Sequence, residues 1–168
     1  ATISYRTAYL KAHYPVEFMT AFLTAESRGA SGPSKNEKIA EGVAECKRLN
    51  IKVLPPDINK SESEFSIEGK NSIRFGLSAI KNIGEAAIKS ITSSRREEPF
   101  KDLVDFCKTV DLASVNKKTI ESLIKSGAMD AFGKRTTLLM IYQEVLGISH
   151  KAKKQKQEGQ TSLFEEKT

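Results

Sequence analysis

Prolines and glycines divide this sequence into short segments, and within most of them apolar residues recur every three or four positions. Pro15 suits the first turn of a helix, whereas Pro55 and Pro56 exclude a helix around them. The spacing therefore predicts a mainly α protein built from several short amphipathic helices.

Three helices are expected in the first part of the chain, over about residues 3–14, 15–27 and 36–49. The turn-rich stretch SRGASGPSKN separates the second from the third, with Ser34 and Asn36 as possible N-caps. The residues expected to line the three apolar faces are Tyr5, Tyr9 and Leu10; Val16, Met19, Phe22 and Leu23; and Ile39, Val43, Cys46 and Leu49.

Apolar residues that alternate on either side of a glycine turn predict one small β-hairpin. Phe65 and Ile67 precede the turn at Gly69–Asn71, and Ile73 and Phe75 follow it. The proline-containing stretch before the hairpin is expected to be extended.

The second half of the chain returns to helical spacing as far as His150, where the periodicity stops. The polar tail that follows is expected to be disordered. The apolar faces expected here are Phe100, Leu103, Val104, Cys107 and Val110; Ile120, Leu123 and Ile124; and Leu138, Ile141, Tyr142, Val145 and Leu146.

The 168 residues carry a formal net charge of +6, which is a weak preference for polyanionic partners. No apolar run approaches the roughly 20 residues of a membrane span, and no signal peptide is present, so we expect a cytoplasmic protein. Cys46 and Cys107 fall on predicted apolar faces and are expected to be reduced core thiols. The sequence begins without Met and already in a helical pattern, as a piece of a longer protein would.

The segment GLSAIKNIGEAAIKSI, residues 76–91, predicts two short helices joined by a tight turn that ends at Gly84. Backbone N–H groups of the turn and of the following helix's first residues have no partner within the helix. They can donate to phosphate oxygens at the positive end of the helix dipole. Lys81 and Lys89 add positive charge nearby, so the segment is a candidate for binding a sugar–phosphate backbone irrespective of base.

The same residues resemble the helix-hairpin-helix DNA-binding motif, whose core is apolar–x–Gly–apolar–Gly. Asn82 takes the place of the first glycine, and Asn is the next most tolerant residue of a left-handed conformation. Ile83 and Gly84 match the following two places, while Ile88 stands where the motif usually has Ala. The alternative is that Gly84 only forms a turn between two packed helices.

A second segment with two predicted helices joined by a turn spans residues 110–133. Asn116 is expected to cap its second helix and Gly127 to end it. Lys117 and Lys118 occupy the first turn, where the helix dipole disfavours them, and a bound anion would explain their position. The alternative is that they are solvated surface lysines. This segment lacks the hairpin glycines and is the weaker DNA-binding signal.

Several stretches, taken in order, resemble the bacterial DNA polymerase III α subunit family, the replicative C-family polymerases. The resemblance covers nearly all of residues 3–133 and implies the end of the fingers region followed by a tandem helix-hairpin-helix, clamp-binding region. The stretches are SYRTAYLKAHYPVEFMTAFLT, KIAEGVAECKRLNIKVLPPDIN, IRFGLSAIKNIGEAAIKSI and VNKKTIESLIKSGAMDAF.

In this family the region ends in a short peptide that binds the sliding clamp, and a similar peptide stands at the end of this chain. Gln160, Ser162, Leu163 and Phe164 match the family's pattern, while Thr161 replaces the commoner Leu. The resemblance implies that Leu163 and Phe164 enter a pocket of the β sliding clamp. The alternative is that they fold back onto their own domain.

No catalytic or metal-binding residue is assigned. The family's catalytic carboxylates belong to a palm domain upstream, and the resemblance implies magnesium for that parent polymerase and no cofactor for this fragment. Asp102 and Asp105 are spaced for one helix face but are interpreted as solvated carboxylates. His13 and His150 are given no role.

The sequence thus predicts a compact helical domain with helix-hairpin-helix motifs, one small β-hairpin and a disordered tail. Its expected parts are a fingers-type helical region with the hairpin (residues 1–75), a DNA-binding region (76–149) and a basic tail with the clamp-binding peptide (150–168). The resemblance implies a polymerase fragment that holds duplex DNA non-specifically and tethers the enzyme to its clamp, with the remaining polymerase domains as partners and no membrane.

Two other functions are compatible with the sequence. The domain could be a structural spacer without DNA contact, or a helix-hairpin-helix module of a repair enzyme. The tail lysines would either keep a solvated linker extended or attract duplex DNA; they are Lys151, Lys153, Lys154 and Lys156.

Overall fold

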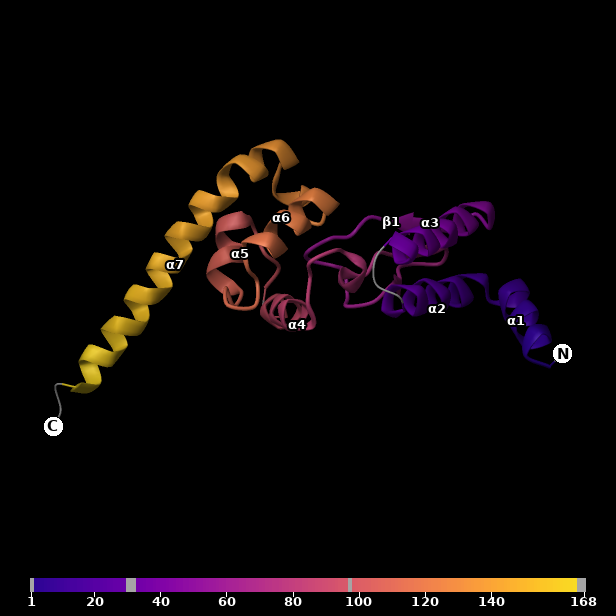
Figure 1. Cartoon of the computed structure of the whole chain (residues 1–168), viewed down its shortest axis with the longest axis horizontal. Helices are drawn as coiled ribbons and strands as arrows, with labels where there is room; N and C mark the ends of the chain where they lie inside the picture. The colour runs from indigo at the N-terminus through magenta and orange to yellow at the C-terminus, as the bar shows by residue number, and fades with distance from the viewer. Residues whose placement is uncertain (1, 30–32, 97, 166–168) are drawn as a thin grey trace.

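The computed structural model describes residues 2–29, 33–96 and 98–165, and the side chains of residues 33 and 156–165 lie outside the description. Within these limits the protein is mostly helical with one small sheet (Figure 1). None of its described helices combines the length and apolar character needed to cross a membrane. The helices are α1 (Thr2–His13), α2 (Pro15–Arg28), α3 (Pro33–Arg48), α4 (Glu85–Ser94), α5 (Leu103–Thr109), α6 (Lys117–Ser126) and α7 (Arg135–Glu165), with short 3₁₀ turns η1 (Leu77–Ala79) and η2 (Asp130–Phe132).

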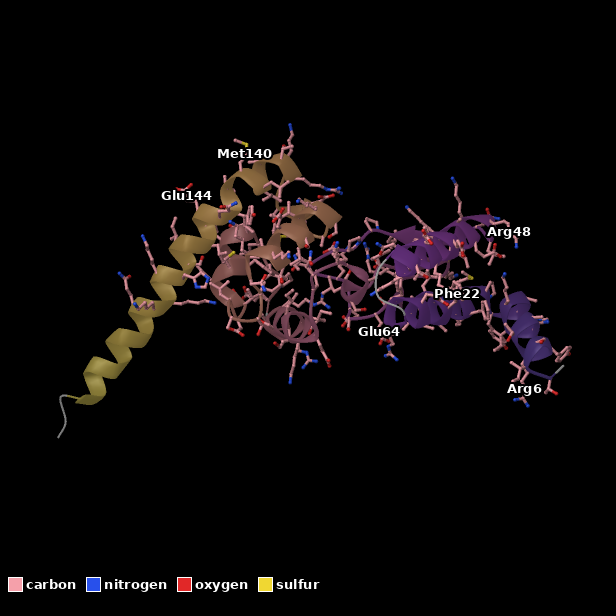
Figure 2. The ribbon with its side chains drawn as sticks, viewed as in Figure 1. Arg6, Phe22, Arg48, Glu64, Met140 and Glu144 are labelled. Carbon is pink, nitrogen blue, oxygen red and sulfur yellow. The ribbon has the colours of Figure 1, made fainter. Side chains whose placement is uncertain are left out.

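Helices α2 and α3 pack closely against each other. As predicted, Pro15 stands at the start of α2, where its missing N–H leaves no hydrogen bond unmade. A Cβ atom on Gly42 of α3 would lie only 2.8 Å from Leu23 Cδ2 and 2.9 Å from Phe22 Cε1. Figure 2 shows Phe22 at this contact between the two helices. The absence of a side chain at Gly42 therefore sets how closely α2 and α3 approach.

Helix α1 forms where it was predicted, but its apolar face is not covered. Tyr5 is 71% exposed, and Tyr9 and Leu10 are each 47% exposed. The ring centroids of Tyr9 and His13 lie 4.2 Å apart along the same side of the helix. No residue of this helix is buried by the other described parts of the chain.

The predicted β-hairpin is confirmed and extended by a third strand. Strand β2 (Ser66–Ile67) pairs antiparallel with β3 (Ser72–Arg74) around the turn that contains Gly69. Strand β1 (Lys52–Leu54) lies parallel to β3 on its other side, in the order β1-β3-β2. The sequence indicated only that this stretch was extended.

Arg74 of β3 ties the sheet to the preceding loop. Its guanidinium donates to both carboxylate oxygens of Glu68, at 2.6 and 2.7 Å, and to the Pro55 carbonyl at 2.8 Å. The side chain is 9% exposed, so these bonds replace the water it would otherwise bind. The hydrogen bond to Arg74 holds the pKa of the Glu68 carboxyl below its usual value.

The buried residues form two clusters instead of one. One lies among α2, α3 and the sheet, and the other among α4 to α7. Ile58, which belongs to the predicted 1–75 region, is buried in the second cluster. The first contains Val16, Met19, Leu23, Ile39, Cys46, Ile51, Phe65 and Ile73; the largest fully buried residues of the second include Ile58, Leu77, Ile91, Phe106, Val110, Ile120, Leu123, Ile124 and Met129.

Helix α7 is longer than its apolar pattern predicts. The sequence predicts a disordered tail from residue 150, whereas the structure gives a helix as far as Glu165 (Figure 1). The helix packs on α5 and α6, which buries Ser149. The Lys153 ammonium donates to the Val110 carbonyl, and its partial burial lowers the pKa of Lys153. Lys153 is therefore part of the packed helix and not of a solvated linker.

Two residues of the apolar faces predicted for the second half of the chain lie on the surface. Val104 is 40% exposed and Ile141 is 39% exposed. Phe106 takes the inward position on α5, where its ring meets Phe100 edge-on at a centroid distance of 5.0 Å. Phe100, Leu103, Cys107 and Val110 are buried as predicted, so on α5 only Val104 departs from the predicted face.

Gly76 joins the sheet to the second cluster under a steric constraint. Its φ of −80° is open to any residue. A Cβ atom there would lie 2.4 Å from the Glu64 carbonyl carbon and 2.7 Å from the Phe65 nitrogen. These are backbone atoms, which cannot rotate away, so glycine is required for close approach.

We expect Gly76→Ala to lower the free energy of unfolding by about 2 kcal/mol, because the added methyl group forces the two backbone segments apart. Thermal unfolding followed by circular dichroism measures this. The matched control is Gly147→Ala, since no described atom lies within 4 Å of the Cβ position at Gly147 and Ala favours a helix over Gly. Equal stability of the two variants would contradict the constraint.

Candidate nucleic-acid interface

The turn between η1 and α4 takes the conformation that the motif requires. Asn82 has φ = 63°, the left-handed region predicted from its place in the motif. Its carbonyl accepts a hydrogen bond from the Thr119 hydroxyl at 3.1 Å, and its side-chain amide donates to Ser122 Oγ at 3.1 Å. Both partners belong to α6, so the second segment (residues 110–133) holds the turn of the first segment (residues 76–91) in place.

Gly84 is the N-cap residue of α4, but its backbone conformation does not require glycine. Its φ of −87° and ψ of 164° are extended values that any residue adopts, so the turn itself does not require glycine at this position. Apart from its two neighbours along the chain, nothing in the described residues lies within 4 Å of its Cβ position. The first N–H groups of α4 have no helical acceptor, and they start beside this open surface. Gly84 therefore leaves room for an outside ligand to approach.

A groove of about 440 Å³ lies between the turn and α6. It brings together Lys81 and Asn82 of the first segment with Lys118 of the second, as a shared phosphate-binding surface would. Both lysines are exposed. The residues that line it are Ile80, Lys81, Asn82, Lys118, Glu121, Ser122 and Lys125.

Four residues of this groove were not predicted from the sequence, namely Ile80, Glu121, Ser122 and Lys125. Glu121, Ser122 and Lys125 stand three, four and seven positions after Lys118 and so share its face of α6. That spacing was available in the sequence. What it could not indicate is that the polar face of α6 turns toward the first segment, because only the hydrogen bonds to Asn82 reveal this orientation.

Helix α6 begins and ends as predicted. Asn116 Oδ1 accepts from the Thr119 N–H at 3.0 Å, which is an N-cap, and Gly127 ends the helix with φ = 87°. The Asn116 oxygen is therefore engaged by its own helix. Lys117 is exposed but is not among the residues that line the groove.

Two other predicted contact residues lie apart from the groove. The Ile83 side chain is 9% exposed and packs in the second cluster, so only its backbone is available to a ligand. Lys89 is exposed on α4 but does not line the groove. Their direct contact with DNA stays a prediction.

The acidic residues considered for metal binding have structural roles. Asp102 caps α5 by accepting from the Asp105 N–H at 2.8 Å, and the Asp105 carboxylate accepts from the Lys101 N–H at 3.0 Å. In the described part of the chain no three His, Cys, Asp or Glu residues gather as metal ligands would.

The two cysteines are buried free thiols, as predicted. Burial raises the pKa of the Cys107 thiol to about 11 and also raises that of Cys46. Neither is a thiolate at neutral pH, so neither is a candidate nucleophile.

The predicted clamp-binding residues fall where the structure describes only the backbone. Gln160, Thr161, Ser162, Leu163 and Phe164 lie within the range of α7, and their side chains lie outside the described residues. Their binding role stays a prediction.

The braced turn, the cap of α4 and the facing α6 define a helix-hairpin-helix protein. The sequence profile described as a helix-hairpin-helix motif matches residues 50–138, which is more than half of the chain. The chain therefore belongs to the helix-hairpin-helix family.

The individual proteins that the chain resembles define its relationship more closely than the motif family does. It is 44% identical over 165 residues to "DNA polymerase III subunit alpha" of Thermus aquaticus, covering 98% of this chain and 13% of that protein. It is 47% identical over 138 residues to the protein of the same name in Bacillus subtilis, covering 82% of this chain and 12% of that protein. The Campylobacter jejuni protein is 41% identical over 170 residues, or 99% of this chain and 14% of that protein. The chain is thus homologous to a segment of DNA polymerase III α subunits that makes up about an eighth of their length.

We expect Asn82→Ala to lower the free energy of unfolding by about 1–2 kcal/mol, because alanine is strained at positive φ and loses the bond to Ser122. Asn82→Gly is the control, since glycine loses the same bond without strain. Chemical denaturation of both variants measures the difference. Similar losses in the two would show that the left-handed backbone is not what Asn82 provides.

Proposed function

We propose that this chain binds duplex DNA through its sugar–phosphate backbone, as part of a DNA polymerase III α subunit. The observation that carries the proposal is the groove in which Lys81, Asn82 and Lys118 meet beside the open N-terminus of α4. Lysines and backbone N–H groups bind phosphate without reading bases, so the binding is non-specific in sequence. A polymerase that copies every sequence needs a contact of this kind.

The size of the groove implies a modest affinity with a measurable salt dependence. Two or three lysines that neutralise phosphates release as many counterions. The logarithm of the binding constant should then fall with the logarithm of salt concentration with a slope of about −2. Attachment of the parent enzyme to DNA elsewhere would raise the effective concentration of this contact.

Gly84→Glu tests the proposal, because it places a carboxylate at the open end of α4 without touching a described neighbour. We expect duplex binding, measured by fluorescence anisotropy, to weaken roughly tenfold through repulsion of phosphate. Stability should change by less than about 0.5 kcal/mol. Gly147→Glu makes the same change of charge at an open glycine on α7 and should bind like the unaltered chain.

If both glutamate variants bind as the unaltered chain does, the groove is not the DNA site. The structural spacer would then be the better interpretation of the domain. A repair-enzyme module is less favoured because the similar proteins described above carry the name of a polymerase subunit.

We further propose that residues 160–164 tether the polymerase to the β sliding clamp. The support is the match of Gln160, Ser162, Leu163 and Phe164 to the clamp-binding pattern of the family that the chain resembles. Burial of one Leu and one Phe contributes about 1.5–3 kcal/mol each before the ordering cost, which suits an affinity on the order of micromolar.

Replacing Leu163 and Phe164 by Ala should abolish clamp binding and leave the affinity for duplex DNA unchanged, because the peptide and the groove act separately. Surface plasmon resonance on immobilised clamp and on immobilised duplex measures the two. A chain that ends at residue 158 should behave in the same way. Loss of both activities together would contradict the separation.

In this proposal the chain itself transfers no nucleotide. The parent enzyme is a cytoplasmic DNA-directed polymerase whose catalytic carboxylates and magnesium belong to its other domains. Those domains are the remaining partners of this segment.

A further inference from the structure

A carboxylate lies inside the basic groove. Glu121 of α6 lines the groove together with Lys81, Lys118 and Lys125. One of its oxygens accepts a hydrogen bond from the Lys125 ammonium, four positions later on the same helix. A surface that binds phosphate gains nothing from an acidic group at this place, since carboxylate and phosphate repel each other.

The position of Glu121 is held from a second side. Its Oε2 accepts from the Tyr142 hydroxyl at 3.5 Å. Tyr142 is only 4% exposed and belongs to α7, so the packing of α7 on α6 fixes where this hydroxyl points. The side-chain amide of Gln143 donates to the same hydroxyl at 3.3 Å. Glu121 is therefore oriented by a buried group and is not a freely solvated carboxylate.

The bond to Lys125 is the first cause that holds the pKa of Glu121 below its usual value, and the Tyr142 hydroxyl adds to it. The carboxylate is charged at neutral pH. In the free chain it neutralises Lys125, which would otherwise be the third lysine of the groove available to phosphate.

We infer that Glu121 is an internal competitor for phosphate, which occupies Lys125 and weakens the grip of the groove on DNA. This inference rests on the proposed DNA-binding function and concerns the strength of that binding. A phosphate that enters the groove has to displace the carboxylate from Lys125 and tolerate its charge. The groove then holds DNA with fewer effective cations than it contains, which favours rapid release as a polymerase advances.

The test compares Glu121→Gln with the unaltered chain in duplex binding over a series of salt concentrations. Glutamine has the same shape and can still accept from Tyr142, so the fold is kept. We expect affinity at low salt to rise about threefold and the salt slope to steepen by about 0.9, the value for one added phosphate contact. Glu144→Gln is the matched control. Glu144 is exposed, and Figure 2 shows it on the side of α7 turned away from α5.

Glu144→Gln makes the same change of net charge but should leave affinity and slope as they were. The double variant Glu121→Gln with Lys125→Gln should lose the gain, because the lysine that was released is absent. A gain that persists in the double variant, or an equal gain in Glu144→Gln, would overturn the inference.

Failure of the inference differs from failure of the proposed function. If Gly84→Glu weakens binding while Glu121→Gln binds like the unaltered chain, DNA occupies the groove and Glu121 does not compete for it. If Gly84→Glu has no effect, the groove is not the DNA site and the inference falls with it.

Discussion

The two hydrogen bonds between α6 and the Asn82 turn are the interaction on which the interface depends. Taken alone, each of the two segments is too small to hold Asn82 in a left-handed backbone conformation and a cluster of lysines in a fixed arrangement. The Thr119 hydroxyl and Ser122 Oγ join the two segments, so that cations distant in sequence face one groove. The apolar side of α6 is buried against α7, and that packing keeps the two hydroxyl groups directed toward the turn. The interface is therefore a product of core packing as much as of charge.

Local features of the fold could be predicted from the sequence because they depend on residues a few positions apart. The caps at Asn116 and Gly127, the left-handed Asn82 and the hairpin turn at Gly69 are all of this kind. The pairing of β1 with β3 could not be predicted. Both strands are too short to show a clear alternation of apolar residues, and they lie many residues apart in the sequence. The groove could not be predicted either, because Glu121 lines it only as a result of the packing of α6 beside the Asn82 turn.

The apolar pattern predicted where the helices lie better than it predicted which of their sides are buried, and the two clusters of buried residues explain the difference. Helix α7 packs on α5 and α6 along one side only, and its length exceeds its apolar spacing because packing and helix propensity sustain it past Ser149. Helix α1 has the opposite character: Tyr5, Tyr9 and Leu10 share one side of it, yet the described parts of the chain leave that side exposed. Periodicity indicates which side of a helix is apolar, whereas the partner that covers that side is a matter of tertiary structure.

The two cysteines have a practical consequence. Both are enclosed by the packed helices and remain protonated thiols, so maleimide dyes and mild oxidants meet no accessible sulfur on the native chain. A single cysteine introduced on the surface would then be labelled selectively without first removing Cys46 or Cys107. Fluorescence or spin-label distances between such a position and a labelled duplex would be readable in the otherwise native sequence.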